Sequence, residues 1–393
     1  MQARRSRSVV AGDRRVRLSP SVAWGIAVVS LAGAVAGAIT GAFPDLDVYR
    51  YGGGAVLDRV SPYAREDPVH GYPFSYPPFA AAAFVPLALI PGWLAAALWT
   101  GASAACLAAT VVLVRRSLGR PCSAAFVVVA CAVALALEPV WQNYVFGQIN
   151  LILMLAMLID VVRPDRRSAG IALGIAAGIK LTPLVFVVLL VLIGRRSAAT
   201  RAVITFVGTV LVGLVAVPGA SAYWGGRLVD PTRVGPPSLA HNQSLSGVLT
   251  RLLDGPPSTL LWMALAGPIA LATVFAAAAW WRKGDRVVGA CLGALAMLLA
   301  SPVSWSHHWV WAVPITLTLW ERSRVSAALW AGVFVARPIL WPPWAQRREY
   351  GWHWYEHLYG NAYVIAAVVL IGWLSWVEVV SRLALRARTS TTG

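Results

Sequence analysis

A succession of long apolar runs is the feature that most constrains how this chain can fold. Runs such as Val22 to Thr40 and Leu260 to Trp280 match the length that a helix needs to cross roughly 30 Å of hydrocarbon. Hydrophobic residues make up 58% of the chain and charged residues only 12%, whereas soluble domains carry about 25% charged residues. Only lipid solvates such a surface, so the sequence predicts an all-α polytopic membrane protein.

The apolar segments follow one another along most of the chain and predict roughly 12 transmembrane helices. After the first run they cover 77–91, 93–114, 122–137, 149–162, 169–194, 202–217, 259–281, 286–303, 309–320, 325–341 and 361–381. We expect one membrane domain at 21–381, between a basic N-terminal arm at 1–20 and a C-terminal tail at 382–393.

The net charge of +17 resides in arginines placed mostly at the ends of the apolar runs. The positive-inside rule therefore predicts a multi-pass cell-membrane protein with both termini in the cytoplasm. Four polar stretches are expected on the outer, periplasmic face: 42–76, 218–258, 301–308 and 342–360. No polar face gathers these arginines along a phosphate track, which argues against nucleic acid as a partner and for the lipid bilayer.

One part of this topology is inconsistent, because the arginine groups near Arg115 and near Arg166 cannot both be cytoplasmic if every segment crosses. The segments 77–91 and 169–194 are the candidates for not crossing. In the second, Lys180 and Pro183 interrupt the apolar run, so two half-height helices are expected to meet there. Discontinuous helices of this kind often line a polar site at membrane depth.

The first outer stretch places a carboxylate, Asp45, a few residues beyond the end of the first apolar run. Ionisable groups at the membrane edge are functional candidates, and this one could accept a proton from a sugar hydroxyl. Helix capping is the structural alternative. Asp47 would share a face with Asp45 on an extended segment, as a metal-binding pair requires, but would diverge from it on a helix.

Basic side chains are the candidate partners for an anionic phosphate group. His307 and His308 lie at an outer helix boundary, and an imidazolium donates hydrogen bonds to anionic oxygens. A zinc site is the competing interpretation, but adjacent helical positions diverge by about 100° and no third ligand is apparent. Lys180 and Arg233 complete the expected set of cations.

Polar residues interrupt apolar sequence at two further places. The first group contains Glu138, Gln148 and Asn150, and the second contains His241, Asn242 and Gln243 beside Arg233. We expect both groups to be buried and paired. The aromatic stretch from Tyr72 to Pro78 is expected to anchor the membrane interface, with a sugar-stacking surface as the alternative.

Seven short motifs in register give the chain a recognisable identity at family level. They are Asp45-Leu-Asp-Val-Tyr49, Tyr76-Pro-Pro-Phe-Ala80, Gly147-Gln-Ile-Asn150, Gly178-Ile-Lys-Leu-Thr-Pro183, Arg233-Val-Gly-Pro236, Asn242-Gln-Ser244 and Ser301-Pro-Val-Ser-Trp-Ser-His-His-Trp-Val-Trp311. In this order the sequence resembles glycosyltransferase family 87, the polyprenol-phosphate-mannose-dependent α-1,2-mannosyltransferases. Asp47 is a departure, because a histidine is expected there in similar members.

The resemblance implies a GT-C membrane fold with an extracytoplasmic first loop, and Asp45 as the catalytic base. It implies an inverting transfer of mannose from polyprenyl-phosphate-mannose to a mannosylated phosphatidylinositol, as in the step from tetramannoside to pentamannoside. Tyr49 and Tyr76 join the candidate site residues through the same motifs. We expect no cofactor and no metal, since cationic side chains can balance the departing phosphate.

Two alternatives stay open at this stage. The first is another transfer from a polyprenol-linked sugar, such as α-1,2 branching of lipomannan or lipoarabinomannan. The second is a lipid-linked sugar flippase or transporter, which would need no base at Asp45.

Overall fold

The computed structural model describes residue 25 and residues 43–390, and these residues form helices connected by irregular segments. The basic arm at 1–20 and nearly all of the first apolar run, 22–40, lie outside the described residues. Within 43–390 the extended backbone is limited to two isolated bridges, Glu66 with Pro73 and Asn242 with Trp305. The all-α prediction is therefore confirmed for the described part of the chain.

The α-helices follow the apolar segments expected from the sequence. They are α2 (Pro44–Leu57), α3 (Pro78–Ala88), α4 (Gly92–Ser117), α5 (Ala124–Ala134), α6 (Glu138–Phe146), α7 (Asn150–Val162), α8 (Ile171–Ile179), α9 (Val185–Leu192), α10 (Arg196–Ala216), α11 (Ala220–Gly225), α12 (Leu245–Leu252), α13 (Thr259–Arg282), α14 (Arg286–Ala300), α15 (Ala312–Trp320), α16 (Arg324–Ala336), α17 (Trp354–Gly360) and α18 (Ala362–Ser390). Short 3₁₀ helices are η1 (Thr182–Leu184), η2 (Arg227–Val229), η3 (Pro231–Val234), η4 (Ser306–Trp311), η5 (Pro338–Leu340) and η6 (Arg348–Gly351).

By length and hydropathy, four described helices can each cross a membrane: α4, α10, α13 and the part of α18 from Ala362 to Val380. A fifth crossing results if α5 and α6, which are bent by 84° at their junction, count as one broken span. Other predicted spans are present as shorter helices, such as α7 and α14. The number of roughly 12 crossings stays a prediction.

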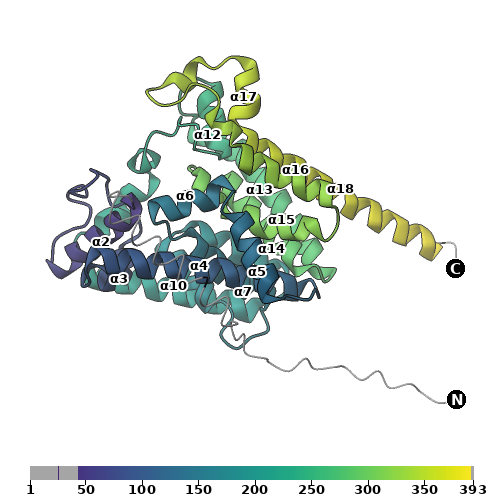
Figure 1. The fold of residues 1–393 in the computed structure, drawn as a ribbon, viewed down its shortest axis with the longest axis horizontal. Helices are drawn as coiled ribbons and strands as arrows, with labels where there is room; N and C mark the ends of the chain where they lie inside the picture. Colours follow the sequence, from purple (N-terminus) through teal and green to yellow (C-terminus); the bar gives the residue numbers. More distant parts are fainter. Residues whose placement is uncertain (1–24, 26–42, 391–393) are drawn as a thin grey trace.

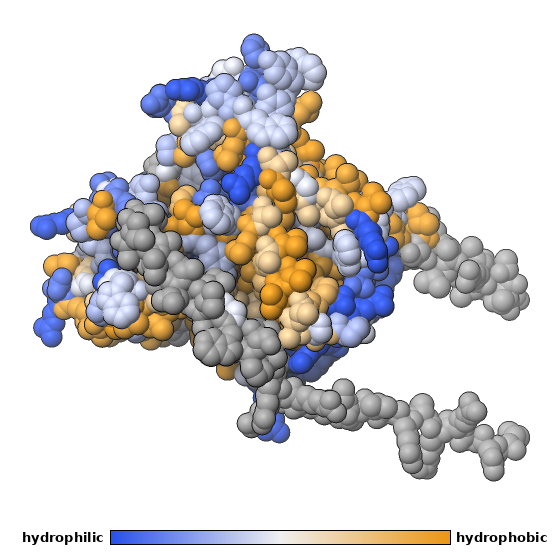
Figure 2. Space-filling view, in the orientation of Figure 1, coloured by the Kyte–Doolittle hydropathy of each residue, from blue (hydrophilic) through white to orange (hydrophobic). Residues whose placement is uncertain are grey.

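Figure 1 shows α2 and α3 at the left of the molecule, α12 and α17 in a lobe at the top, and α18 extending to the right. On the same face, Figure 2 shows apolar surface over the middle of the helical body and hydrophilic side chains at the top lobe and the right-hand edge. This distribution fits a body that contacts lipid and polar ends that contact water.

A chain of ion pairs defines one end of the helical body, which we call the arginine end. Glu321 pairs with Arg115 and with Arg120, the latter at 2.7 Å, and its neighbour Arg322 pairs with Asp285. The chain continues from Arg286 to Asp165 at 3.6 Å and from Asp165 to Arg195 at 2.7 Å. The ends of α4, α7, α9, α13 and α15 and the starts of α8, α10, α14 and α16 therefore meet there.

The segment 169–194 leaves the arginine end and returns to it. Helix α8 stops at Lys180, where the backbone becomes extended, and the chain continues as η1 and α9. Asp165 precedes the segment and Arg195 follows it, and these two side chains are ion-paired. The helix break expected between Ile179 and Pro183 is confirmed, and both ends of the segment lie on the same side.

Close glycine packing holds α8 parallel to α10. A Cβ on Gly170 would meet the backbone of Ala198, and one on Gly178 would lie 2.2 Å from Thr209 Oγ1. Only glycine permits so close an approach. The contacts pair the start of α8 with the start of α10 and the end of α8 with a later part of α10, so the two helices run in the same direction from the arginine end. Helix α9 leads the chain back to the arginine end, where Arg195 pairs with Asp165.

Helix α3, in the second ambiguous segment, also has both ends at the end opposite the arginines. Its start packs on Gly213, near the far end of α10, and its last carbonyls are bound by Arg50 of α2. Arg50 donates to the carbonyls of Leu87 and Ile90, both at 3.2 Å. If neither segment crosses the membrane, the arginine groups near Arg115 and Arg166 can both lie on one side, in keeping with the ion pairs at the arginine end.

Three of the four stretches expected to be outer loops contain more helix than the sequence suggested. The stretch 42–76 contains the 14-residue helix α2, and 218–258 contains α11, η2, η3 and α12. The stretch 342–360 contains η6 and α17. These helices carry much of the candidate site described below.

We predict that residues on either side of 169–194 are accessible from one face of the membrane only. In a variant without the four native cysteines, Arg167→Cys and Arg196→Cys should react with a membrane-impermeant maleimide from the same side, because both are exposed at the arginine end. Arg348→Cys, in the top lobe, should react from the opposite side. Labelling of positions 167 and 196 from opposite faces would show that the segment crosses.

Candidate active site

Asp45 lies in the first turn of α2, directly after Pro44, which is favoured at the first helical position because its missing N–H would be unpaired there. The side chain of Gln148 hydrogen-bonds the carboxylate, and Lys180 and His70 interact with its charge. Burial raises the pKa of Asp45 to about 6, against the opposing effects of these three neighbours. An acid with this pKa is poised to accept a proton near neutral pH.

A tyrosine pair and a tight turn place Gln148 beside Asp45. The hydroxyl groups of Tyr49 and Tyr76 lie 3.0 Å apart, and Tyr49 donates to Gln148 Oε1 at 3.3 Å. Gly147 ends α6 with a positive φ of 68°, and a Cβ there would come within 2.8 Å of Leu46 Cβ. The glycine therefore lets the Gln148 turn approach the first turn of α2.

Lys180 occupies the break between α8 and η1, where helix ends leave polar backbone groups. Its ammonium group lies 3.1 Å from Asn150 Oδ1 and 2.7 Å from His308 Nε2. An ammonium group only donates, so both of these atoms accept. A narrow cavity beside this pair is lined by Asn150, Lys180, Thr182, Ser304 and His308 and by apolar side chains that include Met157, Met297 and Trp311.

The backbone of the two histidines is held by side chains from α6 and α7. The His307 carbonyl accepts from Asn143 at 2.7 Å and from Asn150 at 3.2 Å. Just before it, Ser306 donates to Glu138 Oε1 at 2.7 Å, while Tyr363 donates to Glu138 Oε2 at 3.1 Å. These bonds fix the segment from which His308 reaches Lys180.

The histidines differ from the sequence-based expectation of a phosphate-binding imidazolium. Burial, reinforced by the charge of Lys180, holds the pKa of both His307 and His308 well below the usual value. The rings are 4.8 Å apart and nearly perpendicular. His308 contacts Lys180, whereas His307 Nε2 has no hydrogen-bond partner among the described residues and its ring packs against Phe146. Lys180, rather than an imidazolium, is therefore the side chain of this group that can offer a positive charge.

The second polar group supports the histidine segment from the side of the top lobe. Asn242 Oδ1 accepts from the Ser304 backbone N–H and from the Ser244 hydroxyl, both at 2.9 Å. Gln243 donates from its backbone to the Ser304 carbonyl at 2.8 Å. Both side chains are fully buried, as expected from the sequence. They fix the chain leading to His308 and do not themselves contact it.

Arg233 and His241 lie in the polar stretch 218–258 and are not hydrogen-bonded or ion-paired to Asp45, Lys180 or His308 in the described structure. Arg233 donates to the Ser75 carbonyl and sits over the Tyr223 ring, 5.2 Å from its centroid. His241 packs edge-on against Trp344, with ring centroids 5.0 Å apart. The arrangement gives neither residue direct contact with the Lys180 group.

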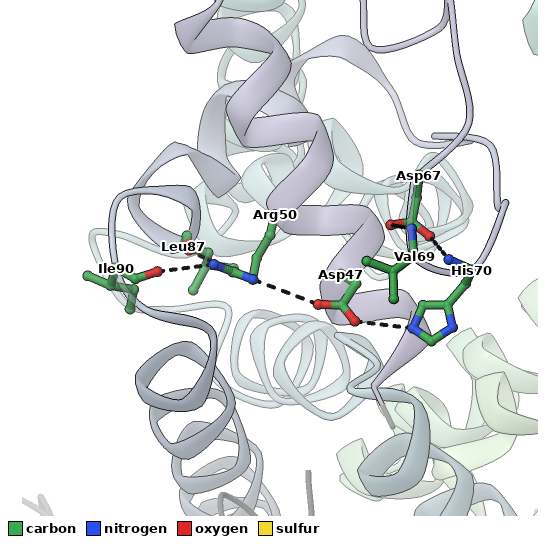
Figure 3. Close-up of polar contacts among 7 residues, drawn as sticks. All are labelled: Asp47, Arg50, Asp67, Val69, His70, Leu87 and Ile90. Atoms are coloured by element: carbon green, nitrogen blue, oxygen red, sulfur yellow. Dashed lines mark hydrogen bonds and ion pairs between the residues drawn. The ribbon is translucent and has the colours of Figure 1, made fainter. Parts of the chain in front are cut away.

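Asp47 points away from the Asp45 site because α2 is helical from Pro44 onward. Its carboxylate lies 3.1 Å from His70 Nε2 and 3.9 Å from Arg50 Nη1. Figure 3 draws both contacts as dashed lines. Within residues 43–390 no group of three or more His, Cys, Asp or Glu side chains is close enough to hold a metal ion.

Several residues of this site were not singled out from the sequence. Ser306 and Tyr363 bind Glu138, and His70 approaches both aspartates of α2. Arg251 is fully buried and uses all five of its N–H groups on three carbonyls and the Asn361 side chain. Only Ser306 had a local signal, its place beside the two histidines.

The fold and site define a helical membrane protein with a buried acid on one side of a polar centre and a lysine–histidine pair on the other. The family model of "Glycosyltransferase family 87" matches residues 74–302. The chain belongs to this family, and it is therefore a glycosyltransferase.

Curated relatives match over most of both chains. A "Polyprenol-phosphate-mannose-dependent alpha-(1-2)-phosphatidylinositol pentamannoside mannosyltransferase" of Mycobacterium tuberculosis (strain CDC 1551 / Oshkosh) is 35% identical, covering 85% of this chain and 81% of the relative. A protein of the same name from Mycolicibacterium smegmatis is 34% identical, covering 85% of each chain.

A "Polyprenol-phosphate-mannose-dependent alpha-(1-2)-phosphatidylinositol mannoside mannosyltransferase" of Mycobacterium tuberculosis (strain ATCC 25618 / H37Rv) is 33% identical, covering 89% of each chain. No solved structure gives a significant match.

We predict that the Glu138–Ser306 bond positions His308 and that the Glu138–Tyr363 bond does not. Each hydroxyl satisfies one oxygen of the same buried carboxylate, so Ser306→Ala and Tyr363→Phe should destabilise the protein by similar amounts, about 1–3 kcal/mol. Only Ser306→Ala should also lower turnover, by about tenfold, which corresponds to about 1.4 kcal/mol. Melting temperature and transfer rate measured together check this.

Combination with His308→Ala supplies the control. If Ser306 acts through His308, adding Ser306→Ala to His308→Ala should cause no further loss of turnover. Multiplicative effects of the two changes would contradict the positioning role.

Proposed function

We propose that this glycosyltransferase moves mannose from polyprenyl-phosphate-mannose to a mannosylated phosphatidylinositol, forming an α-1,2 linkage. Membership of family 87 and the activities named for the relatives support this donor and this class of acceptor. The step from tetramannoside to pentamannoside is the proposed reaction, in line with the sequence resemblance. The pentamannoside-type relatives, at 34–35% identity, support this choice.

The proposal rests on one observation: the carboxylate of Asp45 and the ammonium group of Lys180 lie close enough to interact electrostatically. Asp45 has a pKa raised to about 6, and Lys180 interacts with its charge from the side of His308. Transfer of a sugar from a lipid phosphate requires a base for the attacking hydroxyl and positive charge for the departing phosphate. These two residues can meet both requirements.

In the proposed step, the acceptor 2-hydroxyl oxygen attacks the anomeric carbon of the donor mannose and forms the new glycosidic bond. The bond from that carbon to the phosphate oxygen breaks, and its electron pair leaves with the polyprenyl phosphate. Asp45 takes the hydroxyl proton. One displacement inverts the anomeric carbon, so a β-linked donor gives an α-linked product.

Lys180 would stabilise the negative charge that develops on the leaving phosphate, with His308 and Asn150 holding the ammonium group in place. The neutral His308 accepts a hydrogen bond from Lys180 and so serves as an orienting group. Release of the polyprenyl phosphate would free this cation for the next donor.

We place the site on the periplasmic face and both termini in the cytoplasm. The arginine end collects the ion-paired arginines that the positive-inside rule assigns to the cytoplasm. Asp45, in α2, belongs to the opposite end, where α3 meets the far end of α10.

A different polyprenol-linked transfer, such as branching of lipomannan or lipoarabinomannan, would use the same base and cation. Defined acceptors tested with purified protein separate this possibility from the proposed one. A flippase would need no proton acceptor with a raised pKa at Asp45. Donor turnover in detergent, where no second compartment exists, separates an enzyme from a transporter.

We predict that Asp45→Asn lowers turnover at least about 10²-fold, because the amide keeps the size of the side chain but accepts no proton. Radiolabelled mannose transfer in detergent provides the measurement. The matched control is Asp58→Asn, which removes an exposed carboxylate just beyond the last turn of the same helix. Near-normal turnover of Asp45→Asn would remove the base from this mechanism.

The same residue sets the pH dependence. Because the protonated acid is inactive as a base, kcat/KM should increase with pH along an acid limb whose midpoint lies near pH 6, the pKa of Asp45. A profile that is flat between pH 5 and pH 8 would contradict this assignment.

We predict that transfer persists in EDTA. Lys180 supplies the positive charge that a divalent cation would otherwise provide, and Asp45 and Asp47 diverge on α2. Transfer rates before and after chelation provide the measurement. Loss of activity that Mg²⁺ or Mn²⁺ restores would assign the charge stabilisation to a metal instead.

A further inference from the structure

A hollow with a volume of about 440 Å³ lies where the segment after α2 meets the end of α10. Its lining combines Leu214 and Val215 from the last turn of α10 with Pro218, Ser221 and one cationic side chain, Arg59. Ligand pockets typically have volumes of about 300–1,000 Å³. The reaction proposed above assigns no role to these residues.

The hollow borders a helix that is long and apolar enough to cross a membrane. Helix α10 starts at the arginine end, and its opposite end, at Ala216, lines the hollow. Leu214 is 45% exposed and Val215 is 90% exposed, so no described element covers this part of α10. In a bilayer such side chains contact acyl chains, and the residues just beyond them reach the headgroup layer. The hollow therefore opens at the level where lipid phosphates lie.

Close backbone packing brings Arg59 to the end of α10. Gly219 has a φ of 73°, and a Cβ there would lie 2.5 Å from Ser61 Oγ. Any other residue would push these two segments apart, so glycine keeps the segment after α10 against the segment after α2. The cation is thereby held beside the apolar end of the helix.

Arg59 has a backbone conformation that arginine rarely adopts. Its φ of 57° is left-handed, and it stands just after the C-cap of α2, where glycine is the usual residue. Its N–H donates to the Val56 carbonyl at 3.2 Å, a bond that a glycine would make equally well. Residues other than glycine that keep such a conformation cluster at functional sites, because the strain has to be compensated.

The side chain of Arg59 is available to a ligand. Arg59 is exposed, and its guanidinium group has no hydrogen-bond or ion-pair partner among the described residues. Two arginines of the stretch 218–258 behave differently. Arg227 donates to the Tyr63 carbonyl at 2.8 Å and lies over the Tyr63 ring, and Arg233 is bound in a similar way. Arg59 therefore keeps all five of its N–H groups for a partner outside the protein.

A phosphate group with an apolar chain attached is the ligand that these features fit. The planar guanidinium fork matches phosphate oxygens in charge and in geometry. A free phosphate ion would satisfy this cation but would leave Leu214 and Val215 uncovered. A phospholipid satisfies both, since its acyl chain can lie on the end of α10 while its headgroup meets the arginine.

We propose that the hollow binds one anionic phospholipid from the adjoining leaflet, with its phosphate on Arg59 and an acyl chain along Leu214 and Val215. The Ser221 hydroxyl, which also lines the hollow, offers a further hydrogen-bond donor to the phosphate. The site requires only that α10 lies in a membrane and does not depend on the reaction proposed above.

Site-specific fluorescence quenching tests the site in the full-length protein. A fluorophore is attached to Ala222→Cys, an exposed position beside the hollow, in a variant without the four native cysteines. The protein is placed in phosphatidylcholine nanodiscs that contain increasing fractions of chain-spin-labelled phosphatidylglycerol or of chain-spin-labelled phosphatidylcholine. The variants are Arg59→Gly and Arg59→Lys, and the matched control is Arg65→Ala, which removes an exposed arginine outside the hollow.

Phosphatidylglycerol should reach half-maximal quenching at about a tenfold lower fraction than phosphatidylcholine, whose choline group neutralises its phosphate. Arg59→Gly should remove this preference, Arg59→Lys should keep part of it, and Arg65→Ala should match the wild type. In detergent without added lipid, Arg59→Gly should melt at the wild-type temperature or above it, because glycine adopts the left-handed conformation without strain.

Equal quenching by the two lipids in the wild type, or an unchanged preference in Arg59→Gly, would overturn the site. An equal loss of preference in Arg65→Ala would also overturn it, because it would show a general attraction between the protein surface and anionic lipid. If inorganic phosphate at constant ionic strength abolished the preference, the hollow would belong to a soluble anion. A preference that survives phosphate and is lost in Arg59→Gly but kept in Arg65→Ala supports the lipid site.

Discussion

The need to stabilise Lys180 inside an apolar part of the chain shapes the centre of this protein. An ammonium group away from water requires hydrogen-bond acceptors, because an unpaired buried charge costs several kcal/mol. Lys180 obtains them from α7 and η4, through Asn150 and His308. Asn150 in turn binds Gln148 and the His307 carbonyl, so one cation organises side chains from three distant segments.

The helix arrangement follows from bringing Lys180 to this position. Helix α8 starts at the arginine end, and the extended backbone at Lys180 interrupts it at the point where the side chain meets its partners. The glycines that face α10 allow the close packing that compensates for so short a helix. The break leaves backbone N–H and C=O groups without partners in a helix. Within the membrane such groups are tolerated only where protein or a polar cavity surrounds them, and the cavity beside Lys180 lies at the break.

Much of this could be predicted from the sequence, because apolar periodicity and charge placement are local signals. The break at Lys180 was predicted, the segments 77–91 and 169–194 were singled out as candidates for not crossing, and helices occupy every expected span within the described residues. The helix α2 was missed, since its polar residues and three consecutive glycines are typical of a loop. Its stability comes instead from packing against α3, where Gly53 allows the close approach of Phe84.

Contacts between residues far apart in the chain were beyond the reach of sequence patterns. The Lys180–His308 bond joins residues 128 positions apart, and the Glu138–Tyr363 bond joins residues 225 apart. Burial, and after it the charge of Lys180, lowers the pKa of both histidines, and neither effect could be predicted from local sequence, which is why the expectation of an imidazolium did not match the structure. Likewise, the aromatic stretch from Tyr72 to Pro78 divides in the fold: Phe74 and Tyr76 are buried, whereas Tyr72 stays half exposed.

The first turn of α2 shows how a short segment can supply two different carboxylates. Each residue of a helix is rotated by about 100°, so Asp45 and Asp47 point to opposite sides. Asp45 therefore enters the buried polar centre, where desolvation raises its pKa toward the range that the proposed base would need. Asp47 faces the His70 loop and remains partly exposed. Had this segment been extended, both carboxylates would share one face and favour a metal ion. The helix that begins at Pro44 instead turns the two carboxylates to opposite sides, so that of the two only Asp45 lies in the buried centre beside Gln148.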